Sequence, residues 1–198
     1  AKKRAESEAD ESWAWGQADA KPFDGVVAID LGNTNVVCAH WNFQSRDPEV
    51  TSIEPIAVNV TDAGTFHKLV TGSYKVGDKA LKNRNQINLY RSFRRWLGVD
   101  YKMRPAVTGS KMTPVAVTDL VGAVIKDALQ QLTKKVSPGG EPMRFPNVVV
   151  TVPASGDVAF EYELRQVFDR LRIKGSSELD EATAAGVYSL LRPLLRRE

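Results

Sequence analysis

The chain has 198 residues, of which 42% are hydrophobic and 26% charged, and this composition is typical of a soluble globular protein rather than a disordered one. A single cysteine, Cys38, excludes an internal disulfide and a cysteine-cluster metal site, and two histidines, His40 and His67, leave little for a histidine-based site. The net charge of +3 is too small to indicate polyanion binding by itself. No apolar run approaches the roughly 18 residues of a membrane span, so we expect a cytoplasmic protein.

Residues 1–24 differ from the rest of the chain in charge and in the pattern of apolar residues. They carry six acidic and four basic side chains and show no sustained apolar periodicity, which predicts a linker or tail. Trp13 and Trp15 interrupt this segment. We expect them to contact the same chain, with docking on a partner as the alternative.

The folded region is expected to begin at Gly25. Two apolar runs, residues 26–29 and 36–39, flank a polar turn and predict a hairpin of two buried strands. Residues 58–60 and 68–70 are weaker strand candidates. A short basic helix is predicted over 88–97, and a long one begins at Val115, with Thr118 as its N-cap, and ends before Ser137.

One more strand and two more helices are predicted in the rest of the chain. Residues 147–152 are apolar at successive positions, which predicts a strand buried on both faces and ended by Pro153. Helices are predicted over 160–171 and over 182–191, the last running into Pro193. The order of these elements indicates an α/β fold.

The polar turn Asp30-Leu31-Gly32-Asn33-Thr34-Asn35 is the strongest candidate site. Its glycine permits close backbone approach, and main-chain N–H groups with the Thr34 hydroxyl can surround phosphate oxygens. The carboxylate of Asp30 can hold a hydrated Mg²⁺ beside the same phosphates. The pattern favours a nucleotide site, and an ordinary hairpin turn remains the alternative.

Four segments resemble the heat shock protein 70 chaperones in that family's chain order. VVAIDLGNTN resembles the first phosphate-binding turn of these chaperones and, more distantly, of the actin-like ATPases, and NVVVTVPAS resembles the family's central strand. SELDEATAAGVY is similar to the Asn-Glu-Pro-Thr-Ala-Ala segment. VGDKALKN with NLYRSFRRWLG is similar to the stretch that begins at the family's nucleotide-proximal lysine. Together these matches span about residues 25 to 191.

The resemblance implies an actin-like ATPase lobe of ribonuclease H-like topology, with a mixed sheet and flanking helices. Residues 25–42 and 114–198 would form its core, with 43–113 as a smaller inserted subdomain. ATP or ADP with Mg²⁺ would be the cofactors, and client proteins or cochaperones would be partners. Asp30 would bind Mg²⁺ through water, and Gly32, Asn33 and Thr34 would contact the phosphates. Glu181 would serve as the catalytic glutamate near the attacking water, and Pro153 would couple nucleotide state to a further domain.

Departures from the family limit this expectation. Asn33 stands where the family has Thr, and a gap-free alignment puts Leu81 at the catalytic lysine, so Lys82 is the cation we expect there. Asp180 and Ala182 replace Asn and Pro around Glu181, and Ser155-Gly156 replaces an aromatic pair.

The length of the chain accommodates one lobe, without the family's second phosphate turn. We therefore expect weak ATP binding and negligible hydrolysis by these residues alone, with ATPase activity only if a second lobe or downstream domain completes the cleft.

Three other functions are alternatives to a chaperone. One is a filament-forming or sugar-phosphorylating relative from the same superfamily, for which the sequence shows no sugar-contacting motif. A non-enzymatic interaction module would hold a partner through Trp13 and Trp15 and the C-terminal arginines, which are Arg192, Arg196 and Arg197. The stretch from Tyr90 to Trp96 alternates aromatic with basic residues, as single-stranded nucleic-acid binders do, but we do not expect nucleic-acid binding because the family resemblance accounts for the same stretch. Cys38 is expected in the core, and Ser155 lacks the sequence context of a hydrolase nucleophile.

Overall fold

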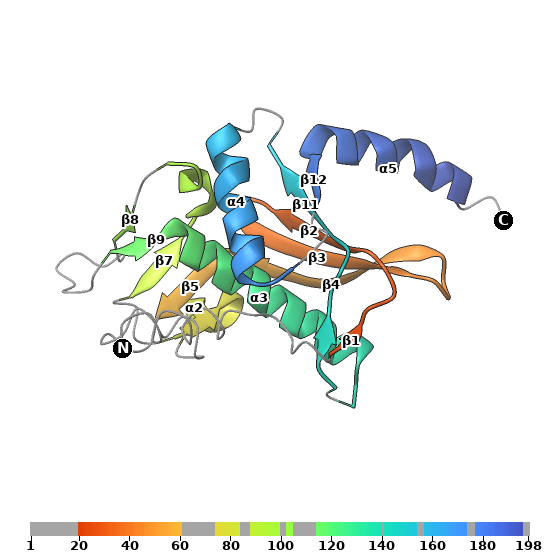
Figure 1. Cartoon of the computed structure of the whole chain (residues 1–198), viewed down its shortest axis with the longest axis horizontal. Coiled ribbons are helices and arrows are strands. Elements are labelled where there is room, and N and C mark those ends of the chain that lie inside the picture. Colours follow the sequence, from red (N-terminus) through yellow and green to blue (C-terminus); the bar gives the residue numbers. More distant parts are fainter. Residues whose placement is uncertain are drawn as a thin grey trace.

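The fold is taken from a computed structural model that describes residues 20–60, 74–83, 88–99, 102–104, 114–139, 141–153, 157–173 and 177–195. The architecture is mixed α/β, as the sequence predicts (Figure 1). Trp13, Trp15, His67, Ser155, Arg196 and Arg197 lie outside the described residues. In the part of the chain described, no helix combines the length and apolar character needed to cross a membrane.

A five-stranded sheet forms the centre of the molecule. Its strands, in spatial order, are β12 (Ser177–Asp180), β11 (Val148–Val152), β2 (Val27–Leu31), β3 (Asn35–Asn42) and β4 (Asp47–Pro55). β12, β11 and β2 pair in parallel, whereas β3 is antiparallel to both of its neighbours. The carboxyl ends of β2, β11 and β12 therefore meet at one edge, where connecting loops can build a site.

Three longer helices accompany this sheet. α3 (Val117–Val136) and α4 (Val158–Arg170) lie side by side against it, and α5 (Glu181–Leu195) extends away from the end of β12 (Figure 1). α3 buries an apolar stripe that includes Leu120, Val124 and Leu132, and each such side chain contributes about 1.5–3 kcal/mol of transfer free energy when fully buried. The predicted helices over 160–171 and 182–191 are confirmed within one to four residues at their ends.

A smaller unit packs beside the main sheet. It contains a sheet of β6 (Tyr74–Val76), β5 (Ala57–Val60) and β7 (Leu89–Arg91), the short helix α2 (Gly77–Leu81), the 3-10 turn η2 (Arg94–Trp96), and the pair β8 (Lys102–Met103) and β9 (Val115–Ala116). A separate two-stranded parallel sheet is formed by β1 (Lys21–Pro22) and β10 (Met143–Arg144). β4 belongs to the main sheet, which therefore extends to Pro55, beyond the boundary at residue 42 expected from the sequence.

The predicted helix over 88–97 is wrong. Residues 89–91 form the edge strand β7 against β5, and only residues 94–96 make one 3-10 turn. Tyr90 and Phe93 are both fully buried, and Gly98, at φ +86°, ends the turn in a conformation that favours glycine. Tertiary burial therefore overrides the local helical pattern. α3 begins after Ala116, without the side-chain cap expected from Thr118.

The hairpin and the central strand lie where the sequence predicts them, but each is fully buried on one face only, since Ala28 and Asp30 of β2 are exposed. β2 and β3 flank the polar turn, and Val148, Val150 and Val152 of β11 are buried while Val149 and Thr151 are half-buried. Cys38 is fully buried in the main core, and burial raises the pKa of its thiol to about 12. A thiol so far from ionisation is no nucleophile, which confirms the expected core role.

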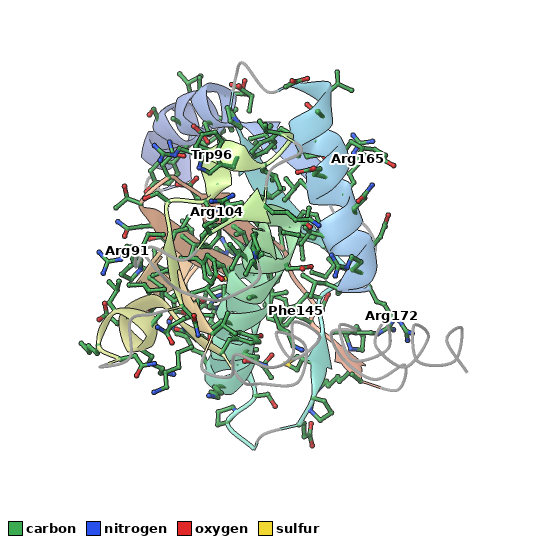
Figure 2. All side chains as sticks on the ribbon, turned by 90° about the vertical axis from the view of Figure 1, so that its left-hand side faces the viewer. Arg91, Trp96, Arg104, Phe145, Arg165 and Arg172 are labelled. Carbon is green, nitrogen blue, oxygen red and sulfur yellow. The ribbon has the colours of Figure 1, made fainter. Side chains whose placement is uncertain are left out.

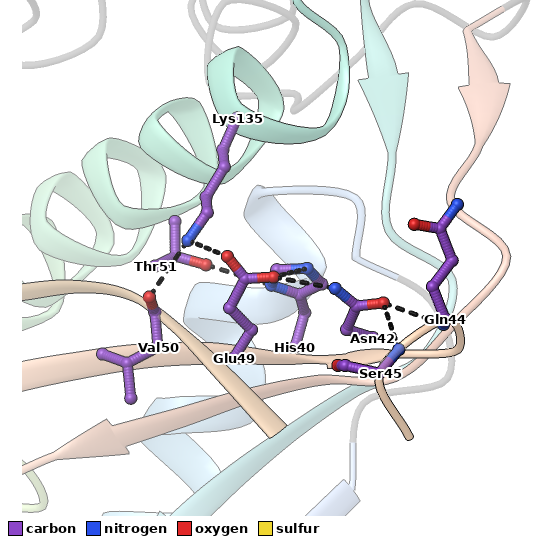
Figure 3. A network of polar contacts seen from close by, with 8 residues as sticks. All are labelled: His40, Asn42, Gln44, Ser45, Glu49, Val50, Thr51 and Lys135. Atoms are coloured by element: carbon purple, nitrogen blue, oxygen red, sulfur yellow. Dashed lines mark hydrogen bonds and ion pairs between the residues drawn. The ribbon is translucent and has the colours of Figure 1, made fainter. Parts of the chain in front are cut away.

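His40 lies in a polar network between the sheet and the end of α3 (Figure 3). Its Nε2 is 3.8 Å from Glu49 Oε2, and its Nδ1 is 3.2 Å from Thr51 Oγ1. Lys135 Nζ contacts the other oxygen of Glu49 at 2.5 Å, and Asn42 Nδ2 donates to Glu49 at 3.0 Å. His40 therefore joins β3 to β4 through Thr51 and Glu49.

Acidification is expected to weaken the fold through His40. Burial lowers the pKa of its imidazole, and the attraction of Glu49 opposes that effect only in part. The unfolded state therefore binds more protons than the folded state as the pH falls through about 6.5. We expect the free energy of unfolding, measured in urea, to decrease from about pH 6.5 towards pH 5. His40→Gln should flatten this dependence, and an unchanged slope in that variant would contradict the assignment.

Candidate functional site

The turn between β2 and β3 is held tight by its own backbone. The Gly32 N–H donates to the carbonyl oxygen of Asn35 at 3.0 Å, and a Cβ at Gly32 would lie 2.8 Å from that oxygen. Only glycine fits without a shift of the turn. The Ile56 N–H donates to the Thr34 carbonyl at 2.7 Å, so the turn is also tied to the segment entering the smaller unit.

Asp30 is oriented by the neighbouring strand. Because Ile29 pairs with Val150 in parallel register, the next residues along β2 and β11, Asp30 and Thr151, lie beside each other. The Thr151 hydroxyl donates to Asp30 Oδ1 at 2.5 Å. The other carboxylate oxygen takes no hydrogen bond from the residues that the structure describes. Thr151 was not identified from the sequence, where it looks like one more residue of an apolar strand.

Glu181 reaches the same edge from β12. This strand ends at Asp180, whose Oδ1 accepts the Thr183 N–H at 2.8 Å and so caps α5. Glu181 is the first residue of that helix, and its side chain is 42% exposed. An aspartate at position 180 therefore performs the capping that an asparagine would also provide.

Arg94 supplies the cation at this site. Its side chain is only 8% exposed, and Nη2 forms an ion pair with Glu181 Oε1. The guanidinium lies over the Phe160 ring, 5.5 Å from the centroid, a favourable cation–π position. The buried Nε has no hydrogen-bond partner among the described groups. A buried donor without a partner is costly, and Ser52, Asn88 and Tyr90 also have buried polar atoms without one.

These residues surround one cavity of about 420 Å³. It is lined by Asp30, Gly32, Asn33, Arg94, Thr151, Glu181, Ala184 and Ala185. Four of the residues selected from the sequence therefore come together: Asp30, Gly32, Asn33 and Glu181. Thr34 is exposed on the same turn but does not line the cavity.

Lys82, the cation expected from the sequence, lies elsewhere. It follows α2, is 78% exposed, and contacts Asp78 Oδ2 at 3.3 Å. It lines a different cavity, with Lys75, Lys79 and Asn83. The structure thus brings Arg94, and not Lys82, to Asp30 and Glu181. Arg94 was visible in the sequence only as one arginine of a basic run.

A second cavity of about 390 Å³ adjoins the first. Asn33 and Arg94 line both cavities, and Pro153, Asp157 and Phe160 line the second. Pro153 therefore stands next to the cation of the first cavity, although the residues that follow it, 154–156, lie outside the described part.

The side chains around the first cavity fit a phosphate bound with a hydrated divalent cation. Arg94 and the Gly32 turn offer positive charge and backbone donors for phosphate oxygens, while Asp30 offers a carboxylate oxygen for a metal-bound water. Among the described residues, no group of three or more His, Cys, Asp or Glu side chains could hold a metal ion. A single carboxylate beside phosphate oxygens is compatible with Mg²⁺ held through water, because Mg²⁺ keeps several waters in many sites.

Comparison with known proteins adds no family assignment, because no protein-family model and no curated protein matches the chain.

Proposed function

We propose that this chain is the first lobe of a heat shock protein 70-like molecular chaperone or chaperone-like ATPase, and that its 420 Å³ cavity receives the phosphate end of ATP or ADP with Mg²⁺. The observation that carries the proposal is the convergence on one cavity of Asp30 and Gly32 from the end of β2 and its turn, Arg94 from η2, and Glu181 from the start of α5. A hairpin turn without a ligand requires no such convergence of opposite charges.

The order of the strands supports an actin-like, ribonuclease H-like lobe. A hairpin-connected trio, β2, β3 and β4, is followed by two parallel strands that add on the other side of β2. The smaller unit is inserted between the trio and α3. In open sheets of this kind, ligands bind beyond the carboxyl ends of the parallel strands, and this is where Asp30, Thr151 and Glu181 lie.

Arg94 would neutralise the charge that develops on a transferring phosphoryl group. Its guanidinium is held in place by Phe160 and Glu181, so little reorganisation is needed to place positive charge at the phosphates. Arginine can also bind two phosphate oxygens at once, whereas a lysine acts as a point charge. We assign to Arg94 the role that the sequence suggested for Lys82.

The carboxylates of Asp30 and Glu181 would accept hydrogen bonds from two kinds of water, those bound to the metal and the one that attacks the phosphate. Mg²⁺, when bound, would neutralise phosphate charge and order its own water ligands. The Asp30 carboxylate would accept hydrogen bonds from those waters, and Glu181, at the start of α5, would accept one from the attacking water. Hydrolysis requires that bulk water be excluded from the site, and a second lobe or a downstream domain is the partner that we propose for this purpose.

α5 offers a surface for such a partner. Val187, Tyr188, Leu190 and Leu191 are 46%, 47%, 75% and 46% exposed on this helix, which extends away from the sheet (Figure 1). Exposed apolar side chains on one element indicate an interaction surface. The same observation favours the alternative function, a protein-interaction module derived from the lobe, with client proteins or cochaperones among the possible partners of either.

Titration with MgATP tests the proposal. We expect saturable binding of the intact chain, weaker than micromolar because one lobe leaves the base uncovered, together with negligible hydrolysis. Asp30→Ala should abolish binding in Mg²⁺ because the metal-bound waters lose their acceptor, and Lys82→Gln should leave binding unchanged. Changes in amide chemical shifts provide the measurement. Absence of saturable shifts in the unmodified chain would instead favour the interaction module.

We expect loss of the Thr151 hydroxyl to weaken the binding of Mg²⁺ at Asp30 but not the direct contacts of the protein with the phosphates. Thr151→Val keeps the shape of the side chain but removes the hydrogen bond to Asp30 Oδ1. We therefore expect the Mg²⁺ concentration needed for half-maximal nucleotide binding to rise about threefold to tenfold, which corresponds to about 1 kcal/mol, the loss of one ordinary hydrogen bond. Thr151→Ser should restore the unmodified value. Equal Mg²⁺ requirements in all three proteins would show that Asp30 is positioned without Thr151.

A further inference from the structure

The smaller unit carries positive charge out of proportion to its size. Residues 57–113 contain eleven basic and three acidic side chains, a net charge of +8, whereas the rest of the chain has a net charge of −5. The overall value of +3 hides this asymmetry. A strong local excess of one sign creates a potential that attracts ligands of the opposite sign.

Four of these cations are arranged around one side of the three-stranded sheet. In β5, the central strand, Val58 pairs with Val76 and Tyr90, and all three are buried in the main core. Because neighbouring residues of a strand point to opposite faces, Lys75 on β6 and Arg91 on β7 lie on the other face.

α2 covers that other face. Its Ala80 packs with Ala57 and Leu89 of the sheet, and Lys79 and Lys82 come from the same short segment. We call Lys75, Lys79, Lys82 and Arg91 the basic face; all four residues are exposed. Figure 2 shows the side of the molecule on which Arg91 projects outward from the smaller unit.

The lysines of the basic face line a hollow of about 570 Å³, together with Asn83. Two carboxylates lie close by: Asp78 contacts Lys82 at 3.3 Å, and Glu54 accepts the Asp78 N–H at 3.2 Å. None of the ion pairs between described residues involves Lys75, Lys79 or Arg91. The net charge of the side chains around the hollow therefore stays positive after the ion pair between Lys82 and Asp78 is counted.

We propose that the basic face docks an acidic polypeptide segment, whose Asp and Glu side chains enter the lysine-lined hollow. Lysine ammonium groups are mobile point charges, and they can follow carboxylates spaced irregularly along an extended chain. This inference stands apart from the nucleotide site, because none of the four cations lines the cavity of Asp30 and Glu181.

The structure disfavours two other polyanions. Binding of single-stranded nucleic acid uses exposed aromatic rings, but Tyr90 and Phe93 are fully buried, and Trp96 is half-buried with Arg95 over its ring at 5.2 Å. Binding to a membrane surface uses apolar side chains that enter the lipid. Within the described part of the smaller unit, Val99 is the one large apolar side chain that is exposed, and it is not part of the basic face.

Fluorescence anisotropy with a short labelled peptide of Asp, Glu and Gly tests the proposal on the intact chain. We expect binding that weakens as salt is added. The triple variant Lys75→Gln, Lys79→Gln, Lys82→Gln should weaken it about tenfold, because each of three partly screened charge contacts contributes modestly. The matched control Lys21→Gln, Lys134→Gln, Arg144→Gln makes the same change in net charge at exposed positions elsewhere and should weaken binding less than twofold, roughly the loss of long-range attraction alone.

Three results would overturn the proposal. One is no binding of the peptide to the unmodified chain, and another is equal weakening by the two triple variants, which would reflect net charge alone. The third is tighter binding of oligo-dT or of phosphatidylserine vesicles than of the peptide under the same salt. Circular dichroism spectra of both triple variants check that they fold, and Arg91→Gln provides a single-residue variant of the same face.

Discussion

Replacement of Arg94 by Met is expected to abolish measurable MgATP binding and to lower the free energy of unfolding by about 1–2 kcal/mol. Methionine keeps much of the apolar contact with Phe160 but removes the cation–π interaction and the partner of Glu181. The loss of stability stays modest because Glu181 is 42% exposed, so solvent screens the carboxylate left behind. The loss of binding is large because the variant retains two carboxylates in the cavity without a compensating charge.

NMR titration with MgATP and urea unfolding measure the two effects. Arg94→Lys should retain part of the binding, since it keeps the charge but loses the two-pronged geometry. Lys82→Met is the control, because Lys82 is exposed and away from the cavity. Loss of binding in Lys82→Met with normal binding in Arg94→Met would reverse the assignment of the cation.

Replacement of Gly98 by Ala should destabilise the protein by about 2–4 kcal/mol, from backbone strain and steric overlap together. Gly98 has φ +86°, and a Cβ there would lie 2.6 Å from the backbone nitrogen of Phe160. Its N–H also donates to Glu163 Oε2 at 2.7 Å. The added methyl group must push the turn that carries Arg94 away from the start of α4.

Urea unfolding of Gly98→Ala and Gly139→Ala provides a matched comparison. Gly139 has no atom within 4 Å of its ideal Cβ position and no positive φ, so its replacement should change the free energy of unfolding by less than about 0.5 kcal/mol. Equal stabilities of the two variants would show that the contact between Gly98 and α4 is looser than the structure indicates.

The sequence predicts best the parts of this fold whose signal is local. The hairpin around Asp30 is visible because two apolar runs flank a turn of Gly and Asn, and α4 is visible because its buried residues recur at helical spacing. Asp30 and Glu181, which line one cavity in the structure, were both selected from the sequence, Asp30 from its place after an apolar run and Glu181 from family resemblance. Both carboxylates lie at the carboxyl ends of parallel strands, Asp30 on β2 and Glu181 directly after β12.

The cation could not be chosen from the sequence, because its choice depends on tertiary packing. Arg94 and Glu181 are 87 positions apart, and nothing in the run of arginines shows which one is buried. Burial of Tyr90 and Phe93 turned the predicted basic helix into an edge strand and a 3-10 turn. That change points Arg94 inwards and leaves Arg91 exposed on the opposite face of the small sheet. Thr151 was missed for a similar reason, since its partner lies on a neighbouring strand.

Crystals of the chain grown with Mg²⁺ and a non-hydrolysable ATP analogue would show whether the cavity of Asp30 and Glu181 receives phosphates. We expect density for the terminal phosphates between the Gly32 turn and the Arg94 guanidinium, with a hydrated metal beside Asp30. Phosphates bound at the basic face instead, with the cavity of Asp30 and Glu181 unchanged, would contradict it.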